Sequence, residues 1–297
     1  VTTPTAYGVG VLNSIKPASG NADFDFTRTS SATRVNPDYL IETVSINSAN
    51  LVQNGNFSEL SSQLITNGNF ETDSDWSKGT GITISGGSAN FTGNANSFLT
   101  QSSVVASNKT YKATFTVSNY ISGAIDINLG GSTRQGNVND NGTYTFYILV
   151  PSGNILYFQE DFSTGFTGSI DNVSVKQVDP NDNWTLGTGW SFGTNEAIAN
   201  TSGNYVNLTQ NNIFEVNKTY ITTFTISAYT QGEVRLTQAG LNVSGLKSAL
   251  GTYTTTYKAV SVGSEDQLIM QGLNSFVGSI TDISVIEIQE NGVPRLD

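Results

Sequence analysis

The chain has 297 residues, of which 37% are hydrophobic and only 12% are charged, and its formal net charge is −11. This acidic balance and the lack of a Lys/Arg cluster exclude nucleic acid as a partner, because nucleic-acid binding requires positive charge to neutralise phosphates. The chain contains no cysteine and no histidine, which excludes disulfides, thiolate metal sites and a Ser-His-Asp triad. No apolar run of 18 residues predicts insertion into a membrane.

Residues 1–62 are predicted to form an N-terminal segment rich in Thr, Ser and Asn, and after them the sequence predicts strands. Val, Ile, Thr, Tyr and Phe dominate runs such as 111–117, 144–150 and 170–175. Gly, Asn, Ser and Asp clusters separate these runs at intervals of about 8–12 residues, which is typical of a sandwich or jelly roll.

A stretch of sequence from the middle of the chain is repeated before the C-terminus. Asn108-Lys109-Thr110-Tyr111 recurs as Asn217-Lys218-Thr219-Tyr220, about 110 residues later, and the block at 168–175 recurs at 278–285. A repeat of this length is a whole domain. We therefore predict an all-β fold of two tandem jelly-roll β-sandwiches, at 63–178 and 179–290. Residues 179–183 would form a short linker, and residues 291–297 would begin a C-terminal continuation.

The opening and closing segments of the first repeat carry a family resemblance. The sequence LITNGNFE at 64–71, Trp76, and GSIDNVSV at 168–175 together resemble a carbohydrate-binding module of the galactose-binding-like jelly-roll type. The resemblance implies glycan binding and a structural Ca²⁺ held by Glu71 and Asp171, in the first sandwich only. The second repeat is expected to lack the NGNFE motif, and Thr281 replaces Asp171. The alternative is a capped strand end with two solvated carboxylates.

Aromatic and cationic side chains are the candidates for holding a sugar, because sugars stack their C–H faces on aromatic rings and hydrogen-bond through hydroxyls. Trp76 and Trp184 are equivalent in the repeat, which favours a core position for both. Trp190 has no tryptophan counterpart, since Ile82 stands near that register, and this favours a variable ligand face. The alternative for these candidates is an ordinary exposed side chain. The predicted ligand-binding residues are Trp190, Tyr120, Tyr229, Arg134 and Arg235.

Two pairs of adjacent carboxylates, Glu160-Asp161 and Glu265-Asp266, recur in the two repeats. A glycosidase or lyase needs two carboxylates aimed at one bond. Adjacent residues on a strand point to opposite faces, so neither pair makes such a site, and solvated turns are the favoured interpretation. The chain is predicted not to be an enzyme.

A second resemblance concerns the two ends of the chain. Residues 23–36 (DFDFTRTSSATRVN), Leu40-Ile41-Glu42 and the final VPRLD are similar to a motif of bacteriophage tail and virion surface proteins. This implies a non-catalytic structural protein of a bacteriophage, tail-fibre-like or surface-exposed, located on the virion surface or outside cells. Its partners would be other virion proteins and host-surface or extracellular polysaccharide, and it would form a homo-oligomer, with a trimer favoured. The alternatives are a purely structural capsid or tail decoration protein, or an accessory region of a polysaccharide depolymerase.

Overall fold

A computed structural model describes residues 7–8, 11–12, 31–35, 41–263 and 266–290. The chain divides into two compact units, one formed by Val1–Ser48 with Ile288–Asp297 and the other by Ala49–Glu287. The described residues form strands, turns and bends. This confirms the predicted all-β fold class. Within the described ranges, no helix is long and apolar enough to cross a membrane.

The first unit is built from short strands. Strand β1 (Tyr7–Gly8) pairs with β2 (Val11–Leu12), and β3 (Ser31–Val35) pairs with β4 (Ile41–Ile46). β4 also pairs antiparallel with the last residues of β22, from Ile288 to Glu290. Apart from 31–35 and Ile41-Glu42, the bacteriophage-like motif lies outside the described residues.

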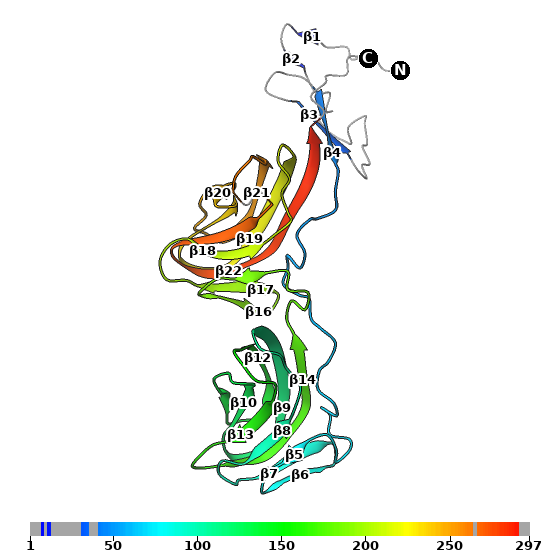
Figure 1. Cartoon of the computed structure of the whole chain (residues 1–297), viewed down its shortest axis with the longest axis vertical. Coiled ribbons are helices and arrows are strands. Elements are labelled where there is room, and N and C mark those ends of the chain that lie inside the picture. Colours follow the sequence, from blue (N-terminus) through cyan, green and yellow to red (C-terminus); the bar gives the residue numbers. More distant parts are fainter. Residues whose placement is uncertain (1–6, 9–10, 13–30, 36–40, 264–265, 291–297) are drawn as a thin grey trace. The chain divides into compact units, whose positions relative to one another are not determined.

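The first sandwich consists of two five-stranded sheets with a core between them (Figure 1). One sheet has the order β11-β10-β13-β8-β5 and the other β12-β9-β14-β7-β6. Alternating side chains fill the core, as a half-buried strand requires; in β9, for example, Tyr111, Ala113, Phe115 and Val117 are buried. The strands are β5 Ser77–Lys78, β6 Ile82–Ser85, β7 Ser88–Thr92, β8 Phe98–Gln101, β9 Lys109–Gly123, β10 Ile125–Leu129, β11 Gln135–Val138, β12 Gly142–Val150, β13 Leu156–Glu160 and β14 Phe166–Gln177.

The second sandwich repeats this arrangement with longer strands. Its β19 matches β9 and β10 joined together, and its β22 matches β13 and β14, so two strands run on where those of the first sandwich are interrupted. A separate buried cluster, which includes Tyr220, Phe224 and Phe276, forms its core. The strands are β15 Thr185–Leu186, β16 Trp190–Gly193, β17 Glu196–Asn200, β18 Val206–Gln210, β19 Thr219–Gln238, β20 Leu241–Asn242, β21 Gly251–Lys258 and β22 Leu268–Glu290.

The second sandwich takes its opening segment from upstream of the first. Val52 and Phe57 belong to the second core, and the Leu51 N–H donates to the Val285 carbonyl (2.8 Å). In Figure 1 this blue segment runs along the second sandwich before the chain enters the first. The domain boundaries drawn from the sequence place residues 49–59 in the N-terminal segment, whereas these contacts place this segment against the second sandwich, with Val52 and Phe57 in its core.

The second repeat was expected to lack the NGNFE motif, and residues 54–57 supply its NGNF part, with Ser58 in place of the glutamate. Phe57 lies 5.3 Å from Trp184 at 40°, just as Phe70 lies 5.2 Å from Trp76 at 40°. The Trp184 indole N–H donates to the Asn54 carbonyl (3.1 Å), and the Trp76 indole N–H donates to the Asn67 carbonyl (3.0 Å). Trp76 and Trp184 are both buried, which confirms their predicted core position.

The glycine of each NGNF motif is required by close backbone contact with the closing strand. The Gly68 carbonyl accepts from Val173 N–H (2.8 Å), and the Gly55 carbonyl accepts from Ile283 N–H (2.9 Å). A Cβ added at Gly68 would overlap the Val173 carbonyl oxygen, and one at Gly55 would overlap that of Ile283. Only glycine permits this approach without a shift of the backbone.

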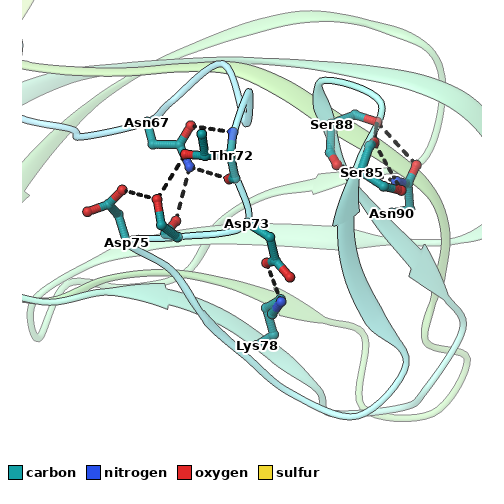
Figure 2. A network of polar contacts seen from close by, with 9 residues as sticks. Asn67, Thr72, Asp73, Asp75, Lys78, Ser85, Ser88 and Asn90 are labelled. Carbon is teal, nitrogen blue, oxygen red and sulfur yellow. Dashed lines mark hydrogen bonds and ion pairs between the residues drawn. The ribbon is translucent and has the colours of Figure 1, made fainter.

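Asn67 fixes the shape of the loop that follows the first NGNF motif (Figure 2). Its Nδ2 donates to the carbonyl oxygens of Thr72 (2.6 Å) and Ser74 (3.0 Å), and the Ser74 hydroxyl donates to Asp75 (2.6 Å). Lys78 pairs with Asp73 at the edge of the same loop. These local bonds explain why Asn67 can hold a φ of 51°, a region that asparagine tolerates better than most residues.

Candidate functional site

The outer face of the β11-β10-β13-β8-β5 sheet collects polar and aromatic side chains. Ile125, Ile127 and Phe158 point into the core, so their strand neighbours face outward. Gln159 on β13 stands between Asp126 on β10 and Phe98 on β8, which places these three in one row across the sheet. A second row consists of Asn128, Tyr157 and Thr100, and the Tyr157 ring meets the Phe98 ring edge-on at 5.9 Å.

A turn at residues 161–165 adds an exposed aromatic ring beside this sheet. The Phe162 side chain is 56% exposed, and the guanidinium of Arg134 lies 4.4 Å from its ring centroid. Arg134 also forms an ion pair with Asp126, with 3.3 Å between Nη1 and Oδ2. Stacking on the ring and pairing with the carboxylate fix the guanidinium, so Phe162, Arg134 and Asp126 form one contiguous group.

Asp161 holds the turn that presents Phe162. Its Oδ1 accepts the backbone N–H groups of Ser163 and Thr164 (2.9 Å each) and their hydroxyls (2.8 and 2.9 Å). These hydrogen bonds hold the pKa of Asp161 well below its usual range, with the backbone N–H of Ser163 contributing most. The carboxylate stays ionised at neutral pH, and the Phe162 ring is presented by an ordered turn.

The neighbouring carboxyl group, Glu160, faces inward. It is fully buried; its Oε2 accepts the Phe166 N–H (2.8 Å), while its Oε1 has no hydrogen-bond partner among the described residues. Burial raises the pKa of Glu160, and the hydrogen bond from Phe166 opposes this shift. Glu160 and Asp161 thus act on opposite sides of the strand end, as the sequence predicts, although Glu160 is buried and not part of a solvated turn.

Glu160→Gln should make the stability of the first sandwich less dependent on pH. An acid with a raised folded-state pKa is stabilising while protonated, so its contribution is lost as the pH rises from its ordinary value of 4.5 through the folded-state pKa. Glutamine keeps an acceptor for Phe166 N–H without the charge. Denaturant unfolding of both proteins between pH 4.5 and 8 measures this, and parallel stability profiles would contradict it.

The second sandwich presents a different row at the matching positions. Gln271 on β22 pairs with Asn207 on β18, and its Nε2 donates to the Asn207 Oδ1 (3.2 Å). Arg235 on β19 donates to the Gln271 Oε1 from both Nε (3.0 Å) and Nη2 (2.7 Å). Of the two predicted ligand-binding arginines, Arg235 therefore lies on β19, whereas Arg134 lies in the loop just before β11.

Trp190 differs from its predicted place on a ligand face, because it is only 6% exposed and packs in the second core. Its indole N–H donates to the Val206 carbonyl (3.2 Å). The reason is that the large side chain of one cross-strand pair lies on opposite strands in the two sandwiches. In the second sandwich Trp190 pairs with the small Ala199, whereas in the first sandwich the smaller Ile82 pairs with the large Phe91. The large side chain has moved to the opposite strand, which conserves the filled volume.

Tyr120 and Tyr229 each close a bend in the chain. The Tyr120 hydroxyl donates to the Gly123 carbonyl (3.1 Å), and the Tyr229 hydroxyl donates to the Gly232 carbonyl (3.2 Å). Both rings are half-buried against their cores. Tyr120 lies on β9, which belongs to the sheet opposite the Phe162 face. Their ligand-binding role stays a prediction.

The expected calcium ligands, Glu71 and Asp171, are not joined by further carboxylates. The oxygens of Asp171 accept the backbone N–H (2.6 Å) and the side-chain amide (3.0 Å) of Asn172, while Glu71 is exposed. In the part of the chain that the structure describes, no group of three or more His, Cys, Asp or Glu residues is placed to hold a metal. Ca²⁺ prefers six to eight oxygen ligands, so Glu71 and Asp171 would need backbone carbonyls or water to complete its coordination, and its presence stays a prediction.

A hollow of about 630 Å³ is a competing candidate site. Its lining includes Leu149, the ion pair of Lys109 with Asp182, and the edges of Trp184 and Trp190. Both indole N–H groups are already bonded to backbone carbonyls. The hollow therefore offers little exposed ring surface, in contrast to Phe162.

Sequence reasoning missed Phe162, Asp126, Gln159 and Gln271. The motif Asp161-Phe162-Ser163-Thr164 held a usable signal, because an Asp followed by Ser and Thr favours a side-chain-capped turn that exposes the residue inside it. The two glutamines carried no such signal, since their shared place in the row follows only from the strand register.

No protein-family model matches the chain, and no curated protein matches it. Among solved structures, the chain is similar to the N-terminal CBM22-1–CBM22-2 tandem domain of Xyn10C from Paenibacillus barcinonensis, with a TM-score of 0.34 and 10% identity over 77% of this chain and 99% of that one. It is also similar to the tandem CBM51 modules of Sp3GH98, a family 98 glycoside hydrolase from Streptococcus pneumoniae SP3-BS71, with a TM-score of 0.23 and 7% identity over 68% and 83%.

Proposed function

We propose that the chain is a non-catalytic protein that binds glycans through the outer faces of its two sandwiches. The observation that carries this proposal is the exposed ring of Phe162, held by the Asp161 turn beside Arg134 and Asp126. A sugar ring needs a flat apolar surface for its C–H groups and polar groups at the edge for its hydroxyls. The Phe162 face supplies both.

Binding without turnover fits the carboxylates near this face. Asp126 is engaged by Arg134 and by the Asn137 N–H (2.7 Å). Glu160, whose pKa is raised, is fully buried and has no access to a substrate. A two-carboxylate hydrolytic site needs both groups exposed to one glycosidic bond, and these residues do not supply it.

The location that we propose is the surface of a bacteriophage virion, as a tail-fibre-like or surface-exposed component. This rests on the motif at residues 23–36 and 293–297, which resembles that of tail and virion surface proteins. Other virion proteins would hold the N-terminal segment, the chain would assemble as a homo-oligomer with a trimer favoured, and the sandwiches would hold host-surface or extracellular polysaccharide. Detection of the chain on purified particles by immunogold labelling tests the location.

Phe162→Ala should weaken glycan binding about tenfold, a loss of about 1.4 kcal/mol, because a few aromatic side chains often carry most of the binding energy of an interface. A glycan array with the full-length chain identifies the bound sugar, and calorimetry compares the variants. Leu149→Ala, which removes an exposed apolar side chain from the lining of the hollow, is the matched control. If Leu149→Ala weakens glycan binding and Phe162→Ala does not, the binding site is the hollow and not the Phe162 face. If the array retains no glycan, a purely structural role as a decoration protein would be the better explanation.

A further inference from the structure

The two outer faces carry matching rows of three residues that share only the central glutamine. In the first sandwich the row is Phe98, Gln159 and Asp126. In the second it is Asn207, Gln271 and Arg235. The central glutamine is common to both rows, whereas an arginine takes the place of the aspartate and an asparagine that of the phenylalanine. The first face is suited to stacking, and the second is polar and cationic.

The two arginines also differ in their partners. Arg134 is paired with Asp126. Arg235 donates only to the neutral Gln271, and no carboxylate among the described side chains forms an ion pair with it. Glu233, the nearest acidic residue along the same strand face, instead accepts from the Asn274 side chain (2.6 Å). Among the described residues, Arg235 therefore has no ion-pair partner on the outer face.

The hydrogen bonds of Arg235 leave one edge of the guanidinium available. Nε and one N–H of Nη2 both go to the Gln271 Oε1. A guanidinium has five N–H donors, so both N–H groups of Nη1 and the second N–H of Nη2 remain. Gln271 is buried and is held by Asn207, so it acts as a positioning residue that fixes the direction of this free edge.

We propose that the second sandwich binds a carboxylate-bearing sugar, such as a uronate, through the free Nη1–Nη2 edge of Arg235. This edge matches the two oxygens of a planar carboxylate in a bidentate pair. The inference rests on the proposed glycan-binding function and assigns its second face a different ligand class from the first. Because the protein carries a net charge of −11, long-range attraction of polyanions does not explain such binding, and local geometry must.

The experiment measures binding of uronate oligosaccharides to the full-length chain by calorimetry. Oligomers of galacturonate, glucuronate and mannuronate are each compared with their carboxyl-reduced forms. At least one uronate oligomer should bind tenfold or more tightly than its reduced form, and Arg235→Gln should abolish that difference. Lys258→Gln, which removes an exposed positive charge on β21 outside both rows, is the matched control and should preserve it. Arg235→Lys, which keeps the charge but loses the fork, should retain only part of the preference.

Two results would overturn the inference: no uronate preference in the unmodified protein, or a preference that survives Arg235→Gln. Sulfated oligomers should bind more weakly than uronate oligomers, because the planar guanidinium edge matches a carboxylate and not charge alone. Hydrogen–deuterium exchange of β19 and β22 verifies that Arg235→Gln remains folded. Neutral-glycan binding that depends on Phe162, without a uronate preference, would leave the proposed function intact and remove only this inference.

Discussion

Phe57→Ala should destabilise the second sandwich by about 3–5 kcal/mol, the range for removing a buried phenylalanine. Phe57 precedes the first sandwich in the chain, yet its ring lies 5.3 Å from that of Trp184 and 6.2 Å from that of Phe192. Domains of this kind have only about 5–15 kcal/mol of total stability. The substitution should therefore bring the second sandwich close to unfolding and leave the first intact.

Hydrogen–deuterium exchange with peptide resolution measures this effect. In Phe57→Ala, the amides of β19 and β21 should lose protection, while those of β9 and β12 keep theirs. Phe70→Ala is the mirror control, because Phe70 makes the equivalent contact with Trp76 in the first sandwich (5.2 Å). In Phe70→Ala, the amides of β9 and β12 should lose protection, while those of β19 and β21 keep theirs. Loss of protection in the first sandwich with Phe57→Ala would contradict the assignment of the opening segment.

Asp179→Ala should cost the second sandwich about 3 kcal/mol or more. The buried carboxylate accepts the side-chain amides of Asn54 (3.0 Å) and Asn183 (2.8 Å) and the backbone N–H of Trp184 (2.8 Å). A hydrogen bond to a charged group contributes about 1.5–3 kcal/mol, and its loss leaves a buried donor unsatisfied. Asp179 thereby ties the opening segment to the start of the second repeat.

Denaturant unfolding, with exchange to identify the sandwich affected, measures this loss. Asp182→Ala is the control in the same turn, since Asp182 is 58% exposed and its ion pair with Lys109 should contribute no more than about 1 kcal/mol. Asp179→Asn preserves the side-chain shape at a φ of 49° but replaces one acceptor by a donor, so it should also destabilise. Equal effects of Asp179→Ala and Asp182→Ala would show that the buried hydrogen bonds contribute little.

The all-β fold and the repeat followed from the sequence because strand alternation and turn residues are local signals. The pairing of Phe57 with Trp184 did not, since chain order gives no sign that one domain is inserted behind the opening segment of another. Asp179 likewise stands in a polar stretch predicted as a linker, and only its three buried donors reveal its role. Trp190 was misplaced because the aligned residue, Ile82, is smaller, and the compensating change lies on the partner strand at Ala199.

The candidate site was predictable only in part. Arg134 and Arg235 stood out because the chain has just 13 lysines and arginines together. Phe162 did not, because the exposure of a phenylalanine depends on how Asp161 closes the turn around it. Gln159 and Gln271 gain their place from a cross-strand register that no local pattern specifies.

The two ends of the first sandwich meet beside each other. Leu60 forms a bridge with Val178, and the Ser61 N–H donates to the Gln177 carbonyl (2.9 Å). Insertions between adjacent chain ends are well tolerated in proteins. Residues 60–178 therefore form a domain that is joined to the rest of the chain at two neighbouring points. Recombination, natural or in the laboratory, can therefore replace this domain with another through two neighbouring junctions, while the residues on either side keep their own sequence.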